Sequence, residues 1–104
     1  MDELRPLIDR ISSLLDGRAA DPGGVVTDVE HTLTDGYAAM LELEGERLRV
    51  ERRMSELART VARPEEAGEL RRLAAQLVAT EAKLEEMRTL LAELRRAADS
   101  RSPA

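Results

Sequence analysis

His31 is the chain's one histidine and the first residue to consider for chemistry, because imidazole can act as a base or a metal ligand. Zinc would need further ligands beside it, and nucleophilic catalysis would need an activated nucleophile. The nearby acids Asp28 and Glu30 project from a helix in other directions. The chain has no cysteine, which excludes disulfides, thiolate metal sites and thiol nucleophiles. We therefore expect His31 to face solvent.

Carboxylates occur in pairs four residues apart, at Glu42/Glu46 and Glu81/Glu85. General acid–base catalysis needs a concave site that perturbs the protonation of one member of such a pair. A rod of two helices offers no such cleft, so these side chains are expected on solvated faces. We predict no catalytic residues, no metal site and no cofactor. We therefore expect that the protein is not an enzyme.

Composition limits the possible partners. The chain has 104 residues, 36% of them charged, with a formal net charge of −5. This balance argues against nucleic acid, which needs a basic surface, and against an anionic membrane. No signal sequence opens the chain, and no apolar run approaches the roughly 18 residues of a membrane span. We expect a cytoplasmic protein.

An apolar stripe at the start of the chain predicts a short amphipathic helix over about residues 2–15. Gly17 is its expected C-terminal stop. Residues 1–16 are therefore interpreted as one helical segment, and the Gly/Pro-rich residues 17–25 as a flexible linker. The stripe consists of Leu4, Leu7, Ile8, Ile11, Leu14 and Leu15.

Two long helices are expected after the linker. Thr27 as N-cap and Glu30 three residues later form a capping box, which predicts a helix over about 27–62. Arg63-Pro64 then ends this helix, because the residue before a proline avoids helical geometry. Pro64 suits the first position of a further helix over about 64–98.

Apolar residues repeat along both long helices at heptad spacing, as in a coiled coil. A tight turn before Pro64 pairs residues whose numbers sum to 127, and each pair then joins an a position to a d position. The exceptions in the pattern find partners in this register: Gly36 faces Leu91, and Arg47 faces Thr80. The sequence thus predicts an all-α fold. A long antiparallel two-helix coiled-coil hairpin spans residues 26–99 and is preceded by the short helix. Residues 100–104 are expected to form a disordered tail.

The Arg47/Thr80 layer is interpreted as a polar layer that fixes the register and excludes shifted pairings. The guanidinium could extend outward to Glu44 or Glu81. The alternative is that Arg47 contacts an acidic group of a partner.

Gly36 is unusual because a glycine inside a helix costs about 1 kcal/mol relative to alanine. It could admit Leu91 or let the first helix cross closely. With the neighbouring Tyr37, the chain's one aromatic residue, it could instead form a docking notch, because tyrosine is a common interface anchor.

Apolar residues outside the coiled-coil seam need a cover. The first helix could fold back on the hairpin, pack on a second subunit or bind a partner. Leu41 and Leu48 form a second stripe on the first long helix, and Ala74, Val78 and Leu90 lie off the seam on the other. A partner-binding surface is therefore predicted at Leu7, Ile11, Tyr37, Leu41 and Leu48.

Residues 32–57, TLTDGYAAMLELEGERLRVERRMSEL, resemble a segment of small actinobacterial helical proteins of unassigned function. A second resemblance is to actinobacterial anti-sigma hairpins that bind cyclic di-GMP through the pattern E-x3-S-x2-R-x3-Q-x3-D. Glu65, Arg72 and Gln76 match that pattern, whereas Glu69 replaces its serine and Thr80 its aspartate.

The functional hypothesis is a non-enzymatic coiled-coil module for protein–protein interaction, a small regulatory or adaptor protein that binds a protein partner or itself as a homodimer. The alternative, implied by the second resemblance, is an anti-sigma-type regulator responding to a cyclic dinucleotide, in which case a nucleotide would be a ligand. Neither hypothesis involves nucleic acid or a membrane.

Overall fold

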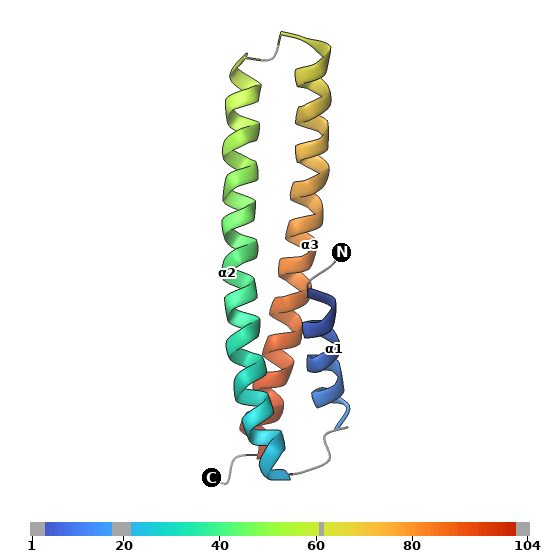
Figure 1. Cartoon of the computed structure of the whole chain (residues 1–104), viewed down its shortest axis with the longest axis vertical. Helices are drawn as coiled ribbons and strands as arrows, with labels where there is room; N and C mark the ends of the chain where they lie inside the picture. The colour runs from blue at the N-terminus through green and yellow to red at the C-terminus, as the bar shows by residue number, and fades with distance from the viewer. Residues whose placement is uncertain (1–3, 18–21, 61, 102–104) are drawn as a thin grey trace. The chain divides into compact units, whose positions relative to one another are not determined.

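A computed structural model describes residues 4–17, 22–60 and 62–101, all as helices and their immediate ends (Figure 1). Its two long helices pack against each other as an antiparallel hairpin, which confirms the predicted fold class. The described helices are α1 (Leu4–Leu15), α2 (Pro22–Thr60) and α3 (Pro64–Arg101).

The chain forms two compact units. Unit 1 comprises α1, the part of α2 up to Met40 and the part of α3 from Glu86 onward. Unit 2 comprises Leu41–Glu85, which are the remaining parts of the two long helices and the turn that joins them.

Helix α1 ends as the sequence predicts. Gly17 adopts a φ of 71°, a left-handed conformation that costs glycine little because it has no side chain. Its amide donates a hydrogen bond to the carbonyl of Leu14 (3.2 Å), and the amide of Asp16 donates to the carbonyl of Ser12 (2.9 Å). These bonds satisfy carbonyl groups that the end of the helix would otherwise leave unpaired.

Helix α2 begins at Pro22, so the predicted capping box at Thr27 is wrong. Proline suits the first helical position, because its φ is already helical and its missing N–H would have had no partner there. Thr27 and Glu30 therefore lie inside the helix, where both are exposed. The predicted linker over 17–25 is helical from Pro22; residues 18–21 lie outside the described part.

The turn between the long helices falls where the sequence places it. Helix α3 begins at Pro64, and the carbonyl of Arg63 accepts hydrogen bonds from the amides of Glu66 (3.1 Å) and Ala67 (3.2 Å). Glu65 and Glu66 lie in its first turn, where carboxylates complement the helix dipole. The helix continues to Arg101, three residues beyond the predicted end; residues 102–104 of the predicted tail lie outside the described part.

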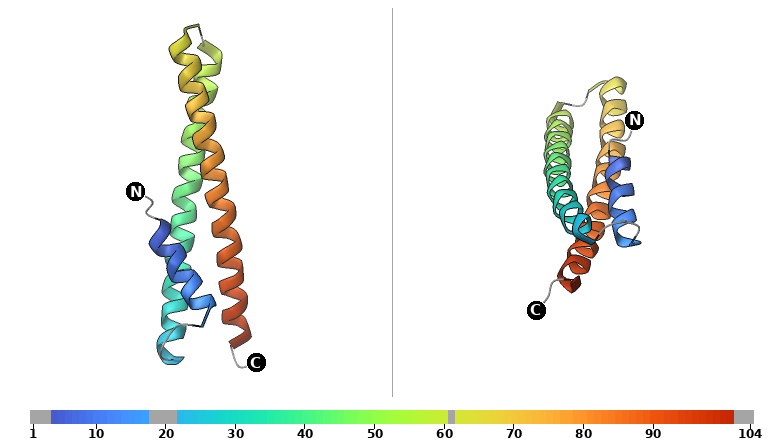
Figure 2. Two further views of the ribbon diagram at one scale, coloured as in Figure 1. Left: turned by 90° about the vertical axis from the view of Figure 1, so that its right-hand side faces the viewer. Right: turned by 60° about the horizontal axis from the view of Figure 1, so that its bottom comes forward.

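In unit 1, α1 lies beside the start of α2 (Figure 2). Arg10 joins the two helices: its guanidinium donates to the carboxylate of Asp35 (2.9 Å) and to the hydroxyl of Thr32 (3.1 Å). Because α1 covers the seam between the two long helices in this unit, it excludes water that would otherwise reach the seam. Several side chains of unit 1 are therefore almost fully buried. They are Ile11, Thr32, Met87, Leu91 and Leu94.

The register predicted from the sequence is confirmed in unit 1 at Gly36. A Cβ built on this glycine would contact three side-chain atoms of Leu91, two of them at 3.1 and 3.2 Å, and the third closer still. The glycine therefore faces Leu91, as the pairing of residues that sum to 127 requires. Its role is to admit this leucine.

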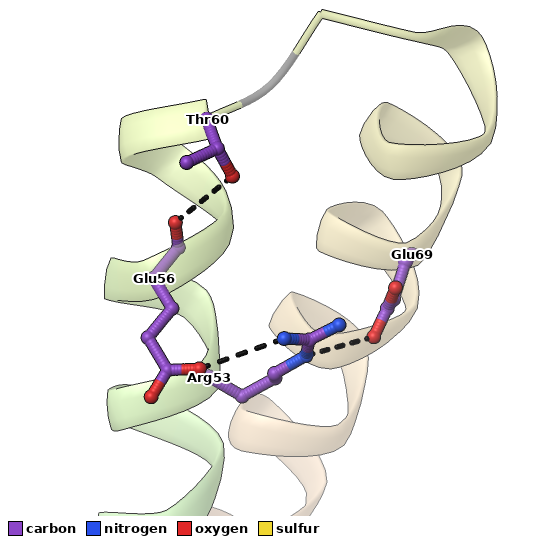
Figure 3. Close-up of polar contacts among 4 residues, drawn as sticks. All are labelled: Arg53, Glu56, Thr60 and Glu69. Carbon is purple, nitrogen blue, oxygen red and sulfur yellow. Dashed lines mark hydrogen bonds and ion pairs between the residues drawn. The ribbon is translucent and has the colours of Figure 1, made fainter.

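In unit 2, polar pairs flank the seam between α2 and α3. Gln76 donates to the carboxylate of Glu46 (3.1 Å), and Arg53 donates to that of Glu69 (3.1 Å). Both pairs sum to 122, which is the flanking pairing expected beside a seam that sums to 127. Arg53 also reaches Glu56 at 3.5 Å (Figure 3). The hydrogen bond to Glu69 is the main reason that the pKa of the Arg53 guanidinium is raised.

Candidate functional site

The structure places two of the predicted partner-binding residues in the core. Ile11 has an exposed fraction of 0%, and Leu7 is also buried, because α1 packs on the other helices of unit 1. Of the three positions left open for the first helix, the structure therefore has the one in which it folds back on its own chain. Neither side chain can contact a partner while unit 1 is intact.

Tyr37 is 42% exposed and is held within unit 1. Its hydroxyl accepts a hydrogen bond from the guanidinium of Arg95 at 3.3 Å. The two residue numbers sum to 132, so this pair flanks the seam on the side opposite to the pairs that sum to 122. The hydrogen bond is the main reason that the pKa of Arg95 is raised.

A groove of about 430 Å³ lies between α1 and α2 in unit 1. Arg10, which lies on its wall, is already paired with Asp35 and Thr32. In the described part of the chain, no group of three or more His, Cys, Asp or Glu residues is placed to hold a metal ion. The groove is lined by Pro6, Asp9, Arg10, Ser13, Leu14, Asp28 and Thr32.

His31, the histidine considered first for chemistry, is exposed, as expected. Among the residues that the structure describes, no helix has a stretch both long enough and apolar enough to cross a membrane.

The predicted polar layer of unit 2 contains a buried hydroxyl and a guanidinium that reaches outward. Thr80 is almost fully buried, whereas the side chain of Arg47 is 35% exposed. The Nε atom of Arg47 is buried and lies 3.4 Å from Glu51, close enough for an ion pair but without hydrogen-bond geometry. The carboxylate that pairs with Arg47 is thus that of Glu51, on the next turn of the same helix, instead of Glu44 or Glu81.

Two leucines of unit 2 remain largely exposed on α2. The exposed fraction is 69% for Leu41 and 50% for Leu48. Gly45 lies between them, and a Cβ built on it would meet only the guanidinium of Arg49, at 3.4 Å. We call Leu41, Gly45 and Leu48 the outer stripe of α2. Sequence reasoning identified the leucines but missed the glycine, although its spacing of four and three residues from them was a usable signal.

The surroundings of the outer stripe are charged. Glu42 and Arg49 lie beside it and are exposed. Within the described part of the chain, neither side chain forms an ion pair or a hydrogen bond. A shallow hollow of about 310 Å³ adjoins Leu48, lined by Glu51, Arg52, Ser55, Glu56 and Arg59. On α3, Val78 is exposed at 70%.

No protein-family model, no curated protein and no solved structure matches this chain. The resemblance to cyclic di-GMP-binding hairpins therefore depends on the residues alone. Thr80, at the position of the ligand-contacting aspartate, is buried in the seam of unit 2. Gln76 and Glu69 are hydrogen-bonded to Glu46 and Arg53 across the hairpin. These contacts give the nucleotide hypothesis no specific support.

Proposed function

We propose that this protein is a non-enzymatic coiled-coil module for protein–protein interaction, a small regulatory or adaptor protein. The observation that supports the proposal best is the outer stripe of α2, where Leu41 and Leu48 are exposed at 69% and 50%. Covering such side chains removes apolar surface from water and gains about 25 cal/mol per Å². The partner is therefore another polypeptide, bound on the side of α2 that the hairpin does not use.

The chain's own packing supports this choice of surface over the others that the sequence suggests. Leu7 and Ile11 are buried within unit 1, and the hydroxyl of Tyr37 accepts a hydrogen bond from Arg95. Leu41 and Leu48 have no such cover within unit 2. Apolar side chains that are scattered singly need no explanation, but two leucines seven residues apart lie on one helix face.

The test is a double substitution, Leu41→Glu with Leu48→Glu. Two carboxylates on the outer stripe cannot be buried without losing their hydration, so binding of the partner is expected to be lost. Both positions are exposed on a helix, and glutamate is a good helix former, so circular dichroism is expected to report unchanged helicity. Binding is measured by capture with the tagged chain, both from host extract and with an untagged second copy.

The matched control is Val78→Glu with Ala82→Glu on α3. Both positions are exposed in unit 2, and the pair adds the same two charges away from the outer stripe. The control is expected to retain the partner. If the Leu41/Leu48 variant captures the same polypeptides as the unaltered chain, the outer stripe is not the binding surface.

A further inference from the structure

Gly45 has no packing role within its own unit. A glycine inside a helix costs about 1 kcal/mol relative to alanine. At Gly36 the missing side chain makes room for Leu91. At Gly45, however, a Cβ would meet only the guanidinium at the end of the Arg49 side chain. A glycine at such a position permits the close approach of another backbone or a large side chain.

The outer stripe faces away from the hairpin. Leu43 and Val50, which are buried in the seam, lie on one side of α2. Leu41, Gly45 and Leu48 are spaced by four and three residues, which gives them a common face on the opposite side. A helix that bound there would meet a leucine, a gap and a leucine in succession, which is the surface of a second coiled-coil seam.

From this pattern we infer that the outer stripe binds α2 of a second copy of this chain, with the two helices antiparallel; the inference rests on the function proposed above and names the partner. In the register that fits, facing residues sum to 86. Leu41 of each copy then enters the gap at Gly45 of the other, because 41 and 45 sum to 86. The two-fold axis then crosses the outer stripe at the level of residue 43. The two Leu41–Gly45 contacts are related by this axis, so they form together.

Charge complementarity supports the same register. Within this hairpin, residues that flank the seam on the Tyr37/Arg95 side sum to five more than residues in the seam. The same offset beside a stripe that sums to 86 pairs residues that sum to 91. Glu42 of each copy then faces Arg49 of the other, and the two-fold axis forms this ion pair twice. Both side chains are exposed and unpaired in the described part of the chain.

The antiparallel orientation follows from the gap. In a parallel pair, Gly45 would face Gly45 and leave a void, and Leu41 would face Leu41. In the antiparallel pair, a large side chain fills each gap, as close packing requires. The surface is thus complementary to itself in shape and in charge, which is why a second copy is the occupant.

The first experiment measures dimerisation of the full chain by sedimentation equilibrium up to roughly 1 mM, which covers weak association. Gly45→Leu fills the gap and is expected to abolish the dimer while raising helicity, because leucine is a better helix former than glycine. This opposite movement separates loss of the interface from loss of the fold. A chain that is monomeric at this concentration, or a Gly45→Leu variant that dimerises as well as the original, overturns the inference.

The second experiment exchanges the flanking charges. Arg49→Glu alone places carboxylate against carboxylate twice and is expected to weaken dimerisation about tenfold. Glu42→Arg alone places guanidinium against guanidinium, with a similar effect. The double variant Glu42→Arg/Arg49→Glu restores both pairs and should recover the original affinity. Failure of the double variant to recover it refutes the register.

The third experiment tests the orientation. The chain has no cysteine, so Arg59→Cys gives a single labelling site, and position 59 is exposed in unit 2. In the antiparallel register, position 59 lies 16 residues from the level of the two-fold axis at residue 43, in opposite directions in the two copies. At a rise of 1.5 Å per residue, two spin labels at position 59 are then about 48 Å apart along the axis. A separation of roughly 10–20 Å would indicate a parallel pair and overturn the inference.

The outcomes also separate this inference from the proposed function. If the chain is monomeric but the Leu41→Glu/Leu48→Glu variant loses a captured protein, the outer stripe binds a different polypeptide. In that case the proposed function stands and self-association is refuted. If the Leu41→Glu/Leu48→Glu variant keeps both the dimer and every captured protein, the proposed function and the self-association are both refuted.

Discussion

Replacing Gly36 with alanine should destabilise the protein, although alanine is the better helix former. The added methyl group would lie in contact with the Cδ1 and Cγ atoms of Leu91 at 3.1 and 3.2 Å, and closer still to Cδ2. Because Leu91 is buried at 2% exposure, its side chain can move away from the methyl group only by displacing its own neighbours.

The magnitude comes from two opposing terms. Helix propensity favours Gly36→Ala by about 1 kcal/mol. Forcing an extra methyl group into a packed core costs about 1–3 kcal/mol. The free energy of unfolding is therefore expected to fall by up to about 2 kcal/mol. Gly68→Ala is the matched control, because a Cβ at Gly68 meets only Arg72, at an ordinary 3.6 Å, and it should raise the free energy by about 1 kcal/mol.

Urea denaturation followed by far-UV circular dichroism measures both variants, because the chain has no tryptophan for fluorescence. Propensity cancels in the difference between them, which leaves the steric term of about 1–3 kcal/mol. Leu91→Ala removes the obstacle, and in that background Gly36→Ala should become stabilising. If Gly36→Ala stabilises the unaltered chain as much as Gly68→Ala does, Leu91 does not face Gly36 and the register is wrong.

Two further substitutions test the packing of each unit. Ile11→Ala, at 0% exposure, should lower the free energy of unfolding by about 2–5 kcal/mol. Amide exchange in α1 should accelerate while the amides of Leu41–Glu85 keep their protection; persistent protection of α1 would contradict its packing on the other helices of unit 1. Arg47→Leu removes a buried Nε atom that has no hydrogen bond, so it should raise the free energy of unfolding by about 1 kcal/mol, measured by urea denaturation. A decrease would mean that the ion pair between Arg47 and Glu51 is stabilising.

Local sequence signals located the end of α1 and the start of α3. Gly17 and Pro64 act through their own backbone preferences, so the end of α1 and the start of α3 fall where they predict. The start of α2 was mispredicted because two start signals compete: the capping box at Thr27 and the proline at position 22. Side chains that can cap a helix do so only where the helix begins, and the helix extends to Pro22.

The heptad pattern determined the hairpin and its register without reference to any structure. Coiled-coil packing repeats, so one turn position and one periodicity fix every facing pair, including Gly36 with Leu91. The sequence also determined that the chain has no cysteine chemistry and that Leu41 and Leu48 lie off the seam.

Only the tertiary structure decided what covers each apolar face. Helix α1 was amphipathic by its sequence, but amphipathicity specifies that a face is buried and does not name its partner. Its contacts with the other helices of unit 1 bury Leu7 and Ile11, while Leu41 and Leu48 stay exposed in unit 2. The two glycines illustrate both sides: the heptad register already placed Gly36 opposite Leu91, whereas only the atoms around Gly45 show that its site is open.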